Sequence, residues 1–249
     1  MLRSALLLLL CCALPVGLGG GALADNEPTL RVVVLDNAPP MSFLNESGQL
    51  TGFSVEIARA VCSEMHVNCT FSVITQSLVQ ETLSQGKADF AAVGLLETPE
   101  RRGKLLFANP YYRSITLWLA RPGVTPGQTG IKVAVVSGSA QEAYGHRLGW
   151  NMHLVKTHGE LGGALLSGEA HATLVPMISA LSLQKNEAFR KLDLATTVLQ
   201  AAELGGEASF GISPLRPELQ KEINAALDRI KRNGTYDRIN SRFLPFRVS

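Results

Sequence analysis

Residues 88–112 read ADFAAVGLLETPERRGKLLFANPYY and place a short apolar strand in front of a helix start. The run Phe90–Val93 is typical of a buried parallel strand. Thr98 followed by Pro99 is typical of the first residues of a helix, with a hydroxyl cap and a proline in the first turn. Arg101 therefore falls just beyond the carboxyl end of a strand, where open α/β sheets bind ligands.

An arginine at this position offers a planar guanidinium that can pair with a carboxylate. The same residue can also be a solvated arginine on a helix start. These residues alone leave both interpretations of Arg101 open.

Strands and helices alternate on both sides of this stretch. Before it, the patterns predict strands at Leu30–Leu35 and Asn68–Val73 and helices at Ser54–Met65 and Leu78–Ser84. After it, they predict extended segments at Ser114–Ala120, Ile131–Val136, Ala170–Val175 and Leu192–Val198, and helices at Leu161–Ser167, Met177–Lys185, Pro217–Arg232 and from Thr235. This order predicts an α/β fold of doubly wound, mostly parallel sheets.

Three motifs carry a family resemblance. The Gly94–Arg101 segment with its later Pro-Tyr, the opening LRV…PPMSF…GQLTGFSVEIA from Leu30, and NGTYDRI from Asn233 resemble the bacterial periplasmic solute-binding proteins of polar amino acid uptake (ABC transporter family 3). The resemblance covers nearly all of the chain after its first residues. It implies a type II periplasmic binding protein fold, in which two lobes close like a hinge on a ligand in the cleft between them. It implies no cofactor.

The resemblance also sets the expected domain limits. Residues 1–24 have a positive start, an apolar run and a small-residue cleavage site near Ala24, which predicts a signal peptide and export to the periplasm. We expect residues 25–113 and 210–249 to form a discontinuous first lobe, and residues 114–209 to form the second.

Ligand-binding positions follow from the resemblance, with Arg101 as the carboxylate anchor. The Gly-Ser turn at residues 137–141 also precedes a helix, whose first N–H groups suit an anion, although such turns cap many helices without a ligand. The candidate ligand-binding residues are Asp36, Met41, Gly94, Leu96, Arg101, Ser137, Ser139, Ala140 and Pro176.

The chain departs from the family where an amino acid's ammonium group is bound. Leu35 and Pro176 stand at positions that are usually acidic, and Leu96 and Ala140 replace hydroxyl residues. A buried ammonium without a carboxylate partner costs several kcal/mol. We therefore expect a carboxylate ligand without a free α-ammonium, unless Asp36 or Glu97 turns inward.

The cysteines, the histidines and the net charge indicate which bonds, metal sites and partners the chain is expected to have. Cys62 and Cys69 are the two cysteines after the leader, and in an oxidising compartment they are expected to form a disulfide, the alternative being two buried thiols. Some members of the family carry a bridge at this spacing. The five histidines fall at no metal-ligand spacing and are expected in surface or loop positions. The net charge of +2 gives no case for nucleic acid.

The sequence is compatible with three functions. The first is delivery of a small carboxylate to a membrane permease by a monomeric binding protein, and the second is ligand sensing for a membrane receptor. The third, a dehydratase on the same fold, is disfavoured because Ser179 stands where such relatives carry a glutamate.

Overall fold

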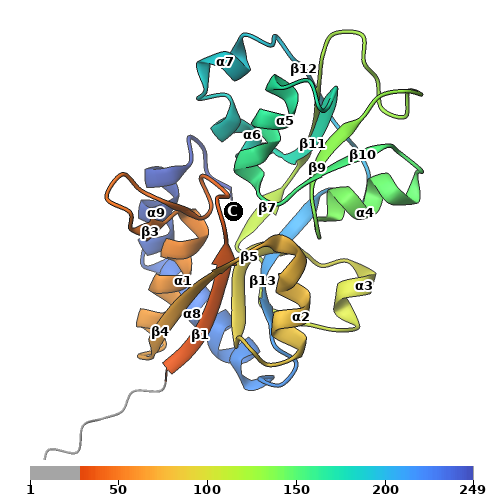
Figure 1. The fold of residues 1–249 in the computed structure, drawn as a ribbon. Coiled ribbons are helices and arrows are strands. Elements are labelled where there is room, and N and C mark those ends of the chain that lie inside the picture. Colours follow the sequence, from red (N-terminus) through yellow and green to blue (C-terminus); the bar gives the residue numbers. More distant parts are fainter. Residues whose placement is uncertain (1–28, 249) are drawn as a thin grey trace, which may run out of the picture.

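The computed structural model describes residues 29–248, and these form two lobes, each built on one sheet (Figure 1). The expected leader, residues 1–24, lies outside the described residues. The first lobe contains the sheet β4-β1-β5-β13-β6, with β7 also paired to β13, and the helices α1–α3, α8 and α9. The second lobe contains the sheet β10-β9-β11-β8-β12 and the helices α4–α7. The predicted fold class is confirmed.

The first lobe begins with a parallel sheet whose order places β1 between β4 and β5. Its strands are β1 (Thr29–Leu35), β4 (Asn68–Ile74), β5 (Phe90–Leu96), β6 (Leu106–Phe107), β7 (Tyr112–Ser114) and β13 (Gly206–Ile212), and β2 (Phe43–Leu44) pairs with β3 (Leu50–Thr51) in a hairpin. Its helices are α1 (Phe53–Glu64), the short η1 (Gln76–Leu78), α2 (Val79–Ser84), α3 (Pro99–Arg102), α8 (Glu218–Arg232) and α9 (Thr235–Phe243).

The second lobe repeats this plan with three parallel strands, β10, β9 and β11. The sheet continues with β8, which runs antiparallel to β11, and then with β12, which runs antiparallel to β8. Its strands are β8 (Thr116–Ala120), β9 (Val133–Val136), β10 (Met152–Val155), β11 (Ala172–Pro176) and β12 (Ala195–Val198). Its helices are α4 (Ala140–Arg147), the short η2 (His158–Glu160), α5 (Leu161–Leu166), α6 (Met177–Leu183) and α7 (Glu187–Arg190).

Alternating side chains of β1 supply the cores on the two faces of the first sheet. Val32 and Val34 pack with α1, α8 and α9, whereas Val33 and Leu35 pack with α2 on the other face. This is the period-two alternation of a strand that is buried on both sides. Both faces are therefore covered, and the carboxyl ends of the strands remain the natural place for a site.

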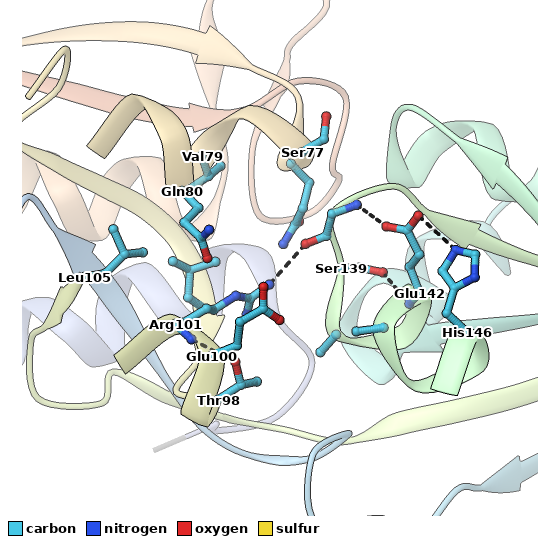
Figure 2. Close-up of a pocket in the computed structure, with 15 residues that line it drawn as sticks. Ser77, Val79, Gln80, Thr98, Glu100, Arg101, Leu105, Ser139, Glu142 and His146 are labelled. Carbon is cyan, nitrogen blue, oxygen red and sulfur yellow. Dashed lines mark hydrogen bonds and ion pairs between the residues drawn. The ribbon is translucent and has the colours of Figure 1, made fainter. Parts of the chain in front are cut away.

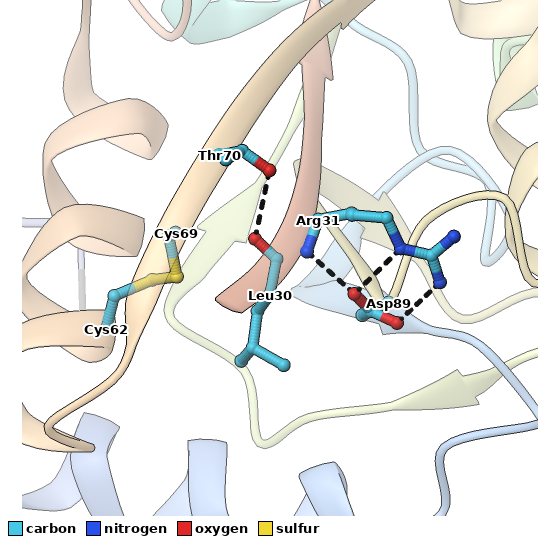
Figure 3. The surroundings of a disulfide bond; sticks show 6 residues. All are labelled: Leu30, Arg31, Cys62, Cys69, Thr70 and Asp89. Carbon is cyan, nitrogen blue, oxygen red and sulfur yellow. Dashed lines mark hydrogen bonds and ion pairs between the residues drawn. A yellow bond between two sulfur atoms is a disulfide. The ribbon is translucent and has the colours of Figure 1, made fainter. Parts of the chain in front are cut away.

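Two features fasten the first lobe at the end of the sheet away from those carboxyl ends (Figure 3). Cys62 of α1 and Cys69 of β4 form a disulfide, as predicted. Asp89, which precedes β5 and is 1% exposed, accepts hydrogen bonds from the backbone N–H and the guanidinium of Arg31. Arg216 pairs with the same carboxylate at 2.9 Å. These contacts join β1, β5 and the approach to α8.

The central strand is longer than the sequence indicated. β5 continues through Gly94 to Leu96, and its pairing with β13 shifts register opposite Phe210. Gly94 has φ +61°, and a Cβ there would lie 2.4 Å from the Tyr112 hydroxyl. The glycine thus allows the strand to kink against this phenol and go on pairing up to the start of α3.

Candidate functional site

A cavity lies between the lobes, where the carboxyl ends of β1 and β5 face those of β9 and β11. Its volume is about 50 Å³, so the lobes are closed around little free space. The lining residues are Leu35, Ala38, Met41, Gln76, Val93, Gly94, Leu96, Arg101, Tyr112, Ser114, Ser139, Ala140, Gln141, His158, Pro176, Ile178 and Ser179. Arg101 is the only charged side chain in this set, and the set includes no aspartate or glutamate.

Arg101 is positioned by the short helix α3. The Thr98 hydroxyl caps this helix by accepting the Arg101 backbone N–H at 3.4 Å. In the guanidinium, Nη1 donates to the Leu96 carbonyl at 3.1 Å, and Nη2 donates to the Gly138 carbonyl of the second lobe at 3.1 Å. The other three of its five N–H donors make no hydrogen bond with residues 29–248.

Arg101 forms no ion pair within the described part of the chain, although the carboxylate of its neighbour Glu100 partly offsets its charge. Burial lowers the pKa of its guanidinium, but an arginine stays protonated at any physiological pH. A buried cation without an ion-pair partner favours an anionic ligand.

The second lobe presents the start of α4 to the same cavity. Ser139 caps this helix by accepting the Glu142 backbone N–H at 3.0 Å, and Ala140 and Gln141 follow in its first turn. Their N–H groups have no acceptor within the helix and lie at its positive end. The Gln141 amide donates to the Thr116 hydroxyl at 2.8 Å, and Thr116 in turn donates to the Leu204 carbonyl. The helix start is therefore fixed to the first residue of β8 and, through it, to the segment between β12 and β13.

His158 is the lining residue that the sequence analysis missed. It begins η2 and is 8% exposed, so the expectation of a surface or loop position is wrong for this histidine. Burial lowers the pKa of its imidazole to about 4, which keeps the ring neutral at physiological pH. Thr157-His158-Gly159 has the composition of a turn, and Thr157 and Gly159 both contact Asn37 of the first lobe.

The two neighbouring tyrosines divide between core and cavity. Tyr111 stacks on Phe53 and its hydroxyl shares a hydrogen bond with Ser54, so it packs in the core. Tyr112 also packs edge-on against Phe53, but it lines the cavity beside Gly94 as well.

Most of the candidate residues come together at the cavity. Its lining includes Met41, Gly94, Leu96, Arg101, Ser139, Ala140 and Pro176, and does not include Asp36 or Ser137. Asp36 is exposed. Glu97 lies on another surface, 4.0 Å from the guanidinium of Arg102. Neither carboxylate is placed to meet a ligand's ammonium group in this closed arrangement.

Direct contacts hold the lobes together on both sides of the cavity. On one side the Gly159 N–H donates to the Asn37 carbonyl at 2.9 Å. On the other, Arg101 bonds the Gly138 carbonyl, and the backbone of Gly138 packs on Ser77 so tightly that a Cβ would lie 2.4 Å from its Cα. Both contacts can form only when the cleft is shut.

Figure 2 shows a second hollow on the outer side of the Arg101–Gly138 contact. Glu142 lies across it, accepting the Gly138 N–H and lying 3.5 Å from His146. The carboxylate of Glu142 therefore interacts with the start of α4 and does not line the cavity between the lobes.

The described residues 29–248 contain no cluster of three or more histidine, cysteine, aspartate or glutamate side chains able to hold a metal ion. Within the same range, no helix has both the length and the apolar character needed to cross a membrane.

Comparison with known proteins finds one family and many similar folds. Residues 30–246 match the family model for bacterial extracellular solute-binding proteins, family 3. The arginine-binding periplasmic protein of Mannheimia haemolytica is 29% identical over 233 residues, which cover 90% of this chain and 94% of that protein.

Solved structures show the same architecture. An ancestral arginine-binding protein bound to arginine is 25% identical and superposes with a TM-score of 0.76, covering 88% of this chain and 99% of that one. A histidine kinase sensor domain with similarity to periplasmic binding proteins is 19% identical with a TM-score of 0.77, covering 90% and 100% of the two chains. The latter likeness concerns the fold alone.

Proposed function

Because this chain belongs to the bacterial extracellular solute-binding proteins of family 3, we propose that it binds a small carboxylate-bearing solute, amino-acid-like or an organic acid, for ABC-type uptake. The observation that carries the proposal is Arg101, the one charged side chain of the cavity lining, which contains no aspartate or glutamate. The chain is a binding protein and not an enzyme, in agreement with the relatives that align along most of its length.

Within this class the cavity favours an organic acid over a standard amino acid. A carboxylate would meet the free N–H groups of Arg101 and the start of α4. An ammonium would meet Leu35, Ala140 and Pro176 at positions where the family's acids and hydroxyls are missing, and no carboxylate lines the cavity. Burial of the ligand's ammonium group without a carboxylate partner would cost several kcal/mol of binding free energy.

Binding would proceed by closure of the two lobes. Two chain segments connect the sheets, one between β7 and β8 and the other between β12 and β13. We take lobe 1 as residues 25–113 and 210–249 and lobe 2 as residues 114–209, with the hinge at these two crossings. The cavity is lined by residues of both lobes, so a solute enters it when the lobes open.

Export and delivery complete the proposal. The relative from Mannheimia haemolytica is a periplasmic protein by name, which supports a periplasmic location with a leader cleaved near Ala24. We expect a monomer that docks on a membrane permease complex. Sensing for a membrane receptor is the alternative, since a histidine kinase sensor domain has the same fold. Neighbouring genes for a permease and ATPase would favour transport, and a neighbouring kinase or cyclase gene would favour sensing.

A thermal-shift screen of organic acids against the twenty amino acids tests the ligand class. A ligand at one hundred times its dissociation constant adds about 2.7 kcal/mol of stability, which gives a readily measured rise in melting temperature. We expect one or more organic acids to raise it. Selective stabilisation by a standard amino acid would overturn the preference, and no response from either set would overturn the small-carboxylate proposal in favour of a protein partner.

A further inference from the structure

His158 lines the cavity and its side chain has no partner among residues 29–248. It makes no hydrogen bond or ion pair with any residue between 29 and 248, although it is more than nine-tenths buried. Its ring nitrogens are not fully enclosed, because Ser42 Oγ is the one fully buried side-chain nitrogen or oxygen without a partner among residues 29–248. They therefore remain accessible from the cavity as one donor and one acceptor. The unpaired imidazole therefore points to a partner that the cavity receives.

The position of this ring is fixed by the closed cleft. Its neighbour Gly159 donates its N–H to the Asn37 carbonyl, and the Asn37 amide donates to the Thr157 hydroxyl at 3.4 Å. These contacts hold the start of η2 against the first lobe on both sides of His158. The imidazole thus belongs to the second lobe but reaches its place in the cavity wall when the first lobe meets it.

Charge decides what kind of group His158 can accept. Arg101 already brings one positive charge to the lining, and a bound carboxylate neutralises it. A ligand ammonium would add a second positive charge with no acid to offset it. A neutral imidazole has one N–H donor and one acceptor nitrogen, and a hydroxyl can serve either without adding charge.

We propose that His158 hydrogen-bonds a hydroxyl of the bound solute, so that the site selects a hydroxy acid over the amino acid of the same carbon skeleton. This inference rests on the proposed function, because it assumes that Arg101 holds the carboxylate. It assigns to the second lobe a specificity-determining residue at the start of η2.

Three matched sets of acids test the inference by calorimetric titration of the purified protein. Each set shares one skeleton and varies only the substituent at the second carbon: lactate, alanine and propionate; 2-hydroxy-4-methylpentanoate, leucine and 4-methylpentanoate; 3-phenyllactate, phenylalanine and 3-phenylpropionate. In the best-bound set we expect the hydroxy acid to bind about tenfold tighter than the unsubstituted acid, and about a hundredfold tighter than the amino acid.

Substitution of the histidine shows whether it is the cause. His158→Phe should reduce the preference for the hydroxy acid over the unsubstituted acid to about one, because the phenyl ring cannot hydrogen-bond. His158→Gln should retain part of that preference. His153→Phe is the matched control, since His153 lies on β10, pairs with Glu169 and is outside the cavity lining, and it should leave the preference unchanged. If His158→Phe fails to fold, His158→Leu provides the same comparison.

The outcomes separate the two proposals. If a carboxylate binds through Arg101 and the preference for the hydroxy acid is the same in wild type and His158→Phe, the role of His158 alone is overturned. The same conclusion follows if the amino acid of a set binds more tightly than its hydroxy acid. Absence of binding by every hydroxy acid would overturn the ligand class assigned here. A carboxylate whose affinity is unchanged in Arg101→Gln would overturn the proposed function itself.

Discussion

Arg101 and His158 reach the same cavity from opposite lobes and give it two different kinds of recognition. Arg101 contributes a fixed positive charge with three free N–H groups, and His158 contributes a neutral ring. Between them the lining is largely apolar, including Leu35, Leu96 and Ile178. A solute with a carboxylate at one end and a neutral polar group elsewhere fits this distribution of charge.

The lowered pKa of His158 predicts a dependence of stability on pH. The folded-state pKa of about 4 lies below the ordinary value of 6.5, so between these values the unfolded chain binds a proton that the folded protein does not. The free energy of unfolding should therefore fall as the pH drops from 6.5 to 4, by about 3 kcal/mol for this residue. Urea unfolding of wild type and His158→Gln across this range measures the difference.

His158→Gln removes the titrating group, so the gap between the two proteins should change with pH only inside this window. A constant gap between pH 6.5 and 4 would mean that His158 is already solvated and protonates as freely as in the unfolded chain.

The sequence predicted the place of Arg101 but not that of His158, and the difference has a physical reason. Arg101 could be anticipated because its environment is local: a strand end, a capping threonine and a proline. His158 could not, because its burial depends on the contact between Gly159 and Asn37, which are far apart in sequence. The amino-acid composition of a turn does not indicate that the turn will lie against another lobe of the protein.

Among the single elements, the sequence predicted that β5 is a strand and that α3 is a helix, but it did not predict the full length of β5. Hydrophobic periodicity gave the strand, and Thr98 gave the helix start. The continuation of β5 past Gly94 depends on pairing with β13, a strand more than a hundred residues later. The short strand β10 and helix α7 were missed for a similar reason, since their pairing and packing are stabilised by tertiary contacts.

The Asp89 cluster is expected to stabilise the first lobe without touching the site. Burial by itself raises the pKa of Asp89, but the hydrogen bonds from Arg31 outweigh it and hold the pKa below its ordinary value. Asp89→Asn weakens the pairs with Arg31 and Arg216, so the free energy of unfolding should fall by about 2–3 kcal/mol. Denaturant unfolding measures the loss.

Glu187→Gln is the control for that substitution, because Glu187 forms an exposed ion pair with Lys191 that should be worth less than about 1 kcal/mol. Ligand affinity should be unchanged in Asp89→Asn, since Asp89 lies at the opposite end of β5 from the cavity. Equal stability losses in the two variants would contradict the role given to the buried carboxylate.

For the whole molecule, closure depends on the close approach of Gly138 to Ser77. Gly138→Ala would place a Cβ 2.4 Å from the Ser77 Cα, so the variant should close poorly and bind ligand at least about tenfold more weakly. Calorimetry measures the affinity. Small-angle scattering should show that the ligand-induced decrease in radius of gyration is diminished.

Gly149→Ala provides the matched control for backbone strain. Gly149 has φ +69°, similar to the +79° of Gly138, but a Cβ there would meet nothing within 4 Å. Both variants should lose a similar amount of stability, about 1 kcal/mol, whereas only Gly138→Ala should lose affinity. Full affinity in Gly138→Ala would mean that ligand binding does not need the closed arrangement.

The affinity of the screened carboxylate for Arg101→Gln, beside Arg102→Gln, tests the central claim most directly. The two arginines are adjacent on α3, but Arg102 is exposed and faces Glu97, outside the cavity lining. Titration calorimetry should show a loss of about 3 kcal/mol, more than a hundredfold, for Arg101→Gln, and no measurable loss for Arg102→Gln. Equal affinity in wild type and Arg101→Gln, with both proteins folded, would contradict the assignment of Arg101 as the carboxylate anchor.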